Sequence, residues 1–175
     1  TVNDTPTYID KANKYNIRLY GADAIVGSTT PADRNYITNG STYGVEINSA
    51  TGTDLINNAF GLRSDNSLAA NGNYAVYNVS SSSGLIEGNV FLGSSYGIYL
   101  AGPSDNNEIK GNTFGVYYDA GVWTSLGSPT NGIRINNGAN NIIGGPTVAT
   151  DDANLNDSNV FDPVSVGIYL YNPTD

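Results

Sequence analysis

Six residues with chemically useful side chains hold equivalent positions in six short, similar segments of the chain. In each segment the residue follows an apolar one, as Tyr99 follows Ile98. Alternate side chains of an extended chain point to opposite faces, so these six are expected to share one outer face. The row consists of Arg18, Glu46, Tyr77, Tyr99, Arg134 and Tyr169.

The chemistry open to this row is limited by its single carboxylate. Inverting hydrolysis of a glycosidic bond uses two carboxyl groups about 6.5–9.5 Å apart, and here Glu46 stands alone between an arginine and a tyrosine. The sequence therefore predicts no catalytic residue. Outward tyrosines can instead stack on sugars or form a protein interface; the simpler interpretation is that strands favour tyrosine.

Other polar clusters give weaker signals for a ligand or a modification. Asp151, Asp152 and Asp157 lie close in sequence, and loop oxygens suit Ca²⁺. No D-x-[DN]-x-[DN]-G pattern accompanies them, so a solvated loop is favoured and no metal or cofactor is predicted. Glycosylation sequons begin at Asn3, Asn39 and Asn156, and a fourth at Asn78 is expected to point inward.

Composition excludes several classes of protein. The 175 residues contain no Cys, Met or His, which removes thiol nucleophiles, cysteine-based zinc sites and histidine bases. A net charge of −9, with only seven Lys and Arg, argues against nucleic acid as a partner. No run approaches the roughly 20 apolar residues of a membrane span. Few charges and abundant Asn, Ser, Thr, Gly and Tyr predict an extracellular or cell-surface protein.

A repeating unit must position all these residues. Its first strand centres on an apolar residue that recurs at intervals of 28, 31, 22, 35 and 35 residues. The shortest interval is enough for three strands of about five residues with tight turns. The longer intervals predict insertions at two fixed places, before and after a corner of the form Asn-x-Phe or Asn-x-Ile. The recurring apolar residues are Ile17, Val45, Val76, Ile98, Ile133 and Ile168.

The corner asparagines predict a ladder. Asparagine tolerates turn conformations, and its amide can bond identical amides in the turns above and below. The expected ladder is Asn35, Asn58, Asn89, Asn112 and Asn159. Four further tyrosines, Tyr15, Tyr43, Tyr74 and Tyr96, lie two residues before the recurring apolar residue. Strict alternation gives them the inward side, so they are expected to form a packed corner stack instead of a binding surface.

These motifs resemble the right-handed parallel β-helix repeats of large secreted bacterial and archaeal surface proteins, a pectate-lyase-like solenoid fold. The resemblance is carried by Asn112, Phe114, Gly115 and Asp119, by Asn131 to Ile135, and by Gly138 to Gly145. It implies an all-β, right-handed parallel β-helix of about five turns. The predicted organisation is an N-terminal arm or cap over 1–15 and the β-helix over 16–175.

Two functions remain open. The leading prediction is a non-catalytic structural solenoid that assembles head to tail into a filament, or forms part of a larger surface or adhesive protein. Its partners would be copies of itself or neighbouring repeats of a longer chain. In pectate-lyase-like enzymes the groove along the first sheet holds a polysaccharide, so the resemblance implies an alternative: a module that binds or degrades polysaccharide on the outer row of tyrosines and arginines. The Asn-Thr-Asp, Asp-Asp and Gly-His-Gly signatures of the family's hydrolases are missing after the strands.

Overall fold

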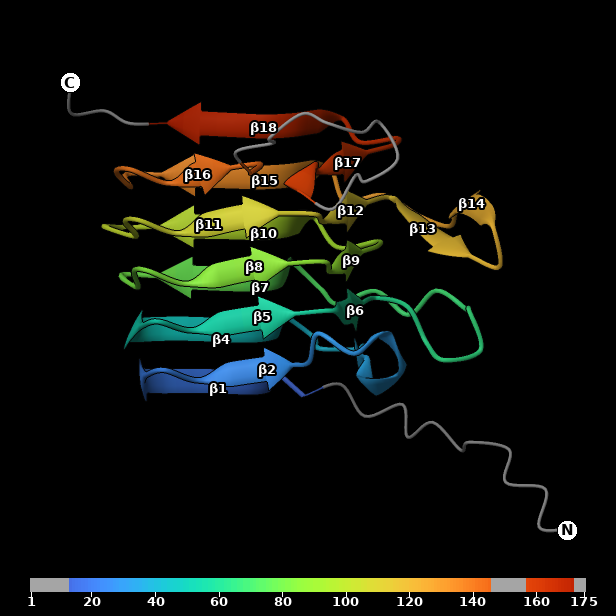
Figure 1. Ribbon diagram of the computed structural model, residues 1–175, viewed down its shortest axis with the longest axis horizontal. Helices are drawn as coiled ribbons and strands as arrows, with labels where there is room; N and C mark the ends of the chain where they lie inside the picture. The colour runs from blue at the N-terminus through green and yellow to red at the C-terminus, as the bar shows by residue number, and fades with distance from the viewer. Residues whose placement is uncertain (1–12, 146–156, 172–175) are drawn as a thin grey trace, which may run out of the picture.

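The computed structural model describes residues 13–145 and 157–171, which wind into a parallel β-helix. The first sheet has six strands in the order β1-β4-β7-β10-β15-β18. Figure 1 shows these strands stacked turn upon turn from β1 to β18. Their bounds are β1 (Tyr15–Ala22), β4 (Tyr43–Thr51), β7 (Tyr74–Val79), β10 (Tyr96–Ala101), β15 (Asn131–Asn136) and β18 (Val166–Tyr171).

Two shorter sheets of five strands each complete the five turns that precede β18. The second sheet contains β2 (Ile25–Gly27), β5 (Asp54–Ile56), β8 (Leu85–Glu87), β11 (Glu108–Lys110) and β16 (Ile142–Ile143). The third contains β3 (Asn35–Ile37), β6 (Asn58–Phe60), β9 (Val90–Phe91), β12 (Thr113–Phe114) and β17 (Val160–Phe161). The prediction of an all-β parallel β-helix is therefore confirmed.

The core is built from identical positions in successive turns. The recurring apolar residues are paired across the first sheet, for example Ile98 with Val76 and with Ile133. Val76, Ile98 and Ile133 are fully buried. The corner phenylalanines stack with ring centroids 4.9 Å apart from Phe60 to Phe91 and 4.7 Å apart from Phe114 to Phe161. Side chains of one kind thus meet their own kind in the neighbouring turn.

The corner asparagines form hydrogen-bonded steps. Each side-chain amide donates to the Oδ1 of the next: Asn35 to Asn58 at 3.0 Å, Asn58 to Asn89 at 3.1 Å, Asn89 to Asn112 at 3.1 Å and Asn112 to Asn159 at 3.0 Å. Each of the middle three also donates to a main-chain carbonyl, as Asn89 does to Leu55 O at 2.8 Å. Asn58, Asn89 and Asn112 are fully buried, so the ladder satisfies polar groups inside the core.

The sequence did not predict two further asparagine contacts of the same kind. Asn107 donates to Asn141 Oδ1 at 3.0 Å, where the chain enters the second sheet. Asn16 donates to Asn71 Oδ1 at 3.2 Å, and Asn71 also donates to Ile37 O at 2.8 Å. Asn107 and Asn141 each precede an inward isoleucine by two residues. This is the Asn-x-apolar signal of the corner ladder, at a second corner.

The longest insertion in the described chain folds into an antiparallel hairpin of β13 (Val116–Asp119) and β14 (Val122–Ser125). It projects sideways from the stack (Figure 1). Asn66, in the insertion after β6, donates to Asp119 Oδ2 at 3.0 Å, so the two insertions contact each other. The 3-10 helix η1 (Pro31–Asp33) lies in the insertion before β3.

The two outermost turns are less buried than the middle ones. Ile168 and Leu170 of β18 are 45% and 66% exposed, although the equivalent Ile98 and Leu100 are fully buried. At the other end, β1 begins at Tyr15, one residue before the predicted start of the β-helix. The carbonyls of Asn13 and Lys14 already accept hydrogen bonds from Ser41 N and Tyr43 N. Residues 1–12 lie outside the described residues.

Candidate binding face

The six outer residues predicted from the sequence form one row across the first sheet. Strand register pairs each with the next: Arg18 with Glu46, Glu46 with Tyr77, Tyr77 with Tyr99, Tyr99 with Arg134, and Arg134 with Tyr169. Neighbouring strands lie about 4.8 Å apart, so the row runs continuously along the helix axis. Tyr169 is 43% exposed, and Tyr77, Tyr99 and Arg134 are half-buried.

The second tyrosine column lies against this row, which corrects its predicted side. Rings of Tyr15, Tyr43, Tyr74 and Tyr96 stack in sequence, with centroids 4.8, 5.4 and 5.2 Å apart. Tyr74 and Tyr96 also contact the outer Tyr77 and Tyr99, at 4.9 and 5.4 Å. The column is therefore a packed stack, as expected, but it belongs to the outer surface.

A break in strand alternation explains why the tyrosine column faces outward although strict alternation predicts that it faces inward. In β7, β10 and β15 two successive residues are buried before the outer one, as Gly97 and Ile98 are before Tyr99. A Cβ on Gly97 would meet Phe114 Cδ1 at 2.8 Å and Gly132 O at 2.7 Å, so Gly97 faces the core. Two consecutive inward positions turn Tyr96 outward. We call the row and the column together the Tyr/Arg face.

Arg18 and Glu46 form an ion pair at one end of the face. Glu46 is only 5% exposed, and its Oε2 accepts from Arg18 Nε. This hydrogen bond raises the pKa of the Arg18 guanidinium above its ordinary value. The guanidinium also lies over the rings of Tyr15 and Tyr20, 4.6 and 4.9 Å from their centroids. The one carboxylate of the row is thus engaged in a structural contact.

Arg134, toward the other end, also lies against aromatic rings. Its guanidinium carbon lies 5.1 Å from the ring centroids of Tyr99 and Tyr169 and 5.7 Å from that of Tyr96. Nη1 donates to Tyr96 OH at 3.2 Å. Among the described residues Arg134 has no carboxylate partner. The two arginines of the face therefore differ: one charge is balanced by Glu46, and the other is held by ring faces.

The tyrosines at the centre of the face keep their protons. Burial raises the pKa of Tyr74, and burial followed by the neighbouring Tyr43 raises that of Tyr77. Both phenols are therefore neutral throughout the physiological range. The face can stack on a ligand, donate hydrogen bonds and attract negative charge at Arg134.

The other predicted site residues are dispersed. Asn3, Asn156, Asp151 and Asp152 lie outside the described residues, while Asp157 is half-buried. In the described parts of the chain no three His, Cys, Asp or Glu residues are grouped to hold a metal ion. Asn39 is half-buried in the loop after β3, and the buried Asn78 accepts a hydrogen bond from Ser104 Oγ at 3.4 Å.

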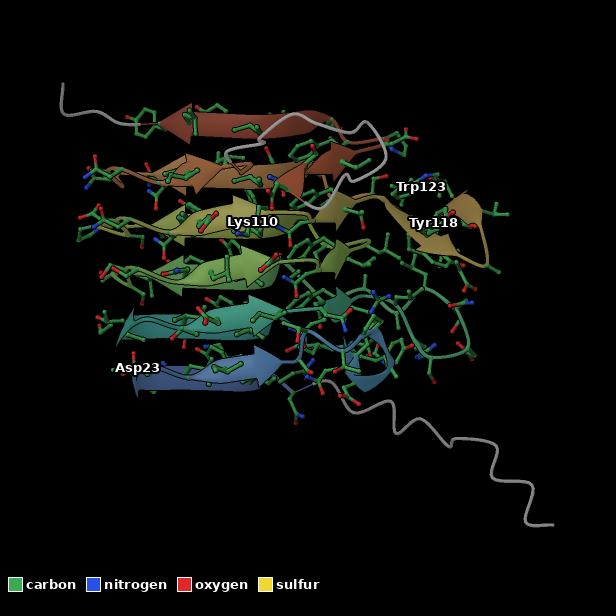
Figure 2. All side chains as sticks on the ribbon, in the orientation of Figure 1. Asp23, Lys110, Tyr118 and Trp123 are labelled. Atoms are coloured by element: carbon green, nitrogen blue, oxygen red, sulfur yellow. The ribbon has the colours of Figure 1, made fainter. Side chains whose placement is uncertain are left out.

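A hollow beside the hairpin was not predicted. It has a volume of about 420 Å³, and Trp123 of β14 lies at its edge with Glu87, Asn57 and Thr113. Figure 2 shows Trp123 and Tyr118 on the projecting hairpin, away from the stacked sheets. Their rings are 5.2 Å apart. The available signal was the pair of aromatic segments flanking Ala120-Gly121.

Similarity to known proteins is found with one family, and that family has this architecture. In the described chain no helix has the length and apolar character of a membrane span. The chain matches no curated protein and no solved structure. A family model described as a right handed beta helix region matches residues 2–175, which agrees with the three stacked parallel sheets. The chain therefore belongs to the right-handed β-helix family.

Proposed function

We propose that this chain is a non-catalytic solenoid of an extracellular surface, which binds an extended polysaccharide along the Tyr/Arg face. The observation that carries the proposal is the unbroken contact of six tyrosine rings between two arginines on one sheet. The face runs along the helix axis and repeats at the strand spacing. A polymer with a repeating unit fits such a surface better than a small compact ligand does.

The scaffold supports binding because it is already ordered. Tyr74 and Tyr77 are held by ring contacts from both neighbouring strands. Side chains fixed before binding lose little conformational entropy when a ligand arrives, which favours affinity. Tyrosine also combines an apolar ring with a polar hydroxyl, as recognition of sugar rings requires.

Binding without cleavage is supported by the state of Glu46. Glycosidase chemistry needs one carboxyl group as an acid and a second as a base or nucleophile. Glu46 is buried and paired with Arg18, and the other members of the Tyr/Arg face are tyrosines and arginines. We therefore assign this face to holding a polymer rather than to cutting one.

A glycan array combined with a turnover assay tests the proposal. Wild-type protein should bind at least one polysaccharide and release no shorter chains from it. Tyr169→Ala removes an exposed ring and should weaken binding about tenfold, equivalent to about 1.4 kcal/mol. Tyr118→Ala, on the hairpin and similarly exposed, is the matched control and should leave affinity unchanged. Absence of binding to every glycan, or release of products, would refute the proposal.

A second candidate function is stacking of a further turn onto β18. Ile168 and Leu170 expose apolar surface whose equivalents are buried in the inner turns. Exposed strand edges pair readily with another strand, which another copy or a further repeat could supply. Sedimentation velocity over a concentration series tests self-stacking. A sedimentation coefficient that rises with concentration in the wild type, but not in Leu170→Lys, would support self-stacking. A monomer at all concentrations would exclude the self-assembled form.

A further inference from the structure

Oxidation of this chain can reach few kinds of side chain. Cysteine and methionine are the side chains that common oxidants usually attack first, and the sequence contains neither. It contains 13 tyrosines and one tryptophan. One-electron oxidation must therefore fall mainly on phenol rings and on Trp123. Where the tyrosines lie consequently decides where oxidative chemistry occurs.

Six of the tyrosines form one contact network on the Tyr/Arg face. Tyr15, Tyr43, Tyr74 and Tyr96 stack in a column, and Tyr77 and Tyr99 lie against it. Every contact in the network has a centroid distance between 4.8 and 5.6 Å. A radical formed on any of these rings can pass to the next without crossing the protein interior.

The rings of the column are poorly oriented for a bond between them. They are nearly parallel, with interplanar angles of 2°, 12° and 16°. Tyr77 is different, because it meets Tyr43 and Tyr74 at 48° and Tyr99 at 75°. Coupling of two phenols occurs through their ortho carbons. In dityrosine the new bond lies close to the plane of both rings, so tilted rings need a smaller rotation than stacked rings to reach the product.

We propose that Tyr77 is the site of an oxidative tyrosine–tyrosine cross-link that joins adjacent turns of the β-helix. Its partner is Tyr99 in β10 or Tyr43 in β4, the tilted neighbours on the adjacent turns. Tyr74 is also tilted against Tyr77, but it lies in the same strand, so a bond to it would not join two turns. Each of the two phenols gives one electron to a one-electron oxidant and one proton to water. The two radicals then join through a carbon–carbon bond between ortho positions, and the two ring hydrogens move to the oxygens. The product is dityrosine, formed with net loss of two electrons and two protons.

The cross-link would join two neighbouring turns of the β-helix covalently. Tyr77 and Tyr99 belong to neighbouring strands but are 22 residues apart in sequence. A covalent link between such positions restricts the unfolded chain more than the folded one, as a disulfide does. The chain has no cysteine with which to form a disulfide. The proposal is independent of the polysaccharide, because it requires no bound ligand.

Photo-oxidation of dilute protein with tris(bipyridine)ruthenium and persulfate tests the proposal. Persulfate takes up the two electrons as it becomes sulfate. The monomer fraction should gain dityrosine fluorescence, and peptide mass spectrometry should find Tyr77 joined to Tyr99 or Tyr43, not to Tyr74 of its own strand. Tyr77→Phe keeps a ring in place but cannot couple, so dityrosine in its monomer should fall several-fold. Tyr118→Phe, outside the network, should not change the yield.

Three results would overturn the proposal. The first is a cross-link distribution that follows exposure and joins Tyr20, Tyr118 and Tyr171. The second is an unchanged yield in Tyr77→Phe. The third is oxidation confined to Trp123, with no dityrosine in the monomer. Circular dichroism of both variants before oxidation verifies that each retains the wild-type fold, so a lower yield reports the chemistry of Tyr77.

Discussion

At the scale of residues, neighbours decide what each side chain does on this repetitive scaffold. Arg18 and Arg134 occupy equivalent positions four strands apart, yet Arg18 neutralises Glu46 while Arg134 lies among three tyrosine rings. The asparagines differ in the same way. Asn89 and Asn112 are completely buried, whereas Asn35 starts the same ladder from an exposed position. Such pairs provide matched controls within a single chain.

The asparagine ladder predicts a graded loss of stability. Asn89→Ala and Asn112→Ala each remove an amide that donates two hydrogen bonds in the core and leave its partners unpaired. Each should lower the free energy of unfolding by about 1–3 kcal/mol. Asn35→Ala should cost less, since water can replace its bond to Asn58. Urea unfolding measures all three, and equal costs at the buried and exposed positions would contradict this account.

Two half-buried phenols, those of Tyr74 and Tyr77, predict loss of stability in alkali. Folding raises the pKa of Tyr74 and Tyr77 above the ordinary 10.0, so the folded state holds these protons more tightly than the unfolded state. Their contribution is fully present below pH 10.0 and disappears as pH rises through the folded pKa values. Urea unfolding midpoints should therefore fall above that pH. The double variant Tyr74→Phe/Tyr77→Phe should show a shallower decline; an identical decline would assign it to other groups.

At the scale of elements, the sequence predicts strands better than corners. Period-two alternation and the recurring Asn-x-Phe corner placed Ile98 inward, Tyr99 outward and the register of the first sheet correctly. Alternation failed at Tyr96, because at the start of β10 two successive residues, Gly97 and Ile98, both face the core. The β13–β14 hairpin was not predicted, because it lies outside the repeat and its only signal is the pair of aromatic segments flanking Ala120-Gly121. The six-residue row of the Tyr/Arg face was thus predicted as a site, and the four tyrosines of the column were assigned to the wrong side.

Gly97 gives this corner a direct test. A Cβ there would lie 2.7 Å from Gly132 O and 2.8 Å from Phe114, and a main-chain oxygen cannot easily move. Gly97→Ala should therefore overpack the corner and lower the free energy of unfolding by about 1–3 kcal/mol. Thermal unfolding and near-ultraviolet circular dichroism measure the change. Ala75 occupies the same position in β7, so Ala75→Gly should have a smaller effect; unchanged stability in Gly97→Ala would show that the corner adapts.

At the scale of the whole molecule, the β-helix is nearly one-dimensional. Each strand of the first sheet is hydrogen-bonded only to the strands of the turns on either side. Stability in such a stack is approximately a sum of terms for each turn and each interface between turns. The inner turns, with two interfaces, bury their apolar rows completely, whereas Ile17 and Leu19 of β1 are only half-buried. Local stability should accordingly depend on position along the axis.

Native-state hydrogen exchange should reveal this dependence. Amides of β7 and β10 should exchange slowest, because Val76, Ile98 and Leu100 are fully buried between two neighbouring turns. Protection should decrease toward β1 and toward β18, where Leu170 is 66% exposed. Repeating the measurement at high protein concentration separates two causes. Protection of β18 that rises with concentration would indicate a second copy stacked on its edge, and protection that stays low would indicate fraying of a free turn. Uniform exchange from β1 to β18 would mean that the helix opens as a single cooperative unit, contrary to the one-dimensional description.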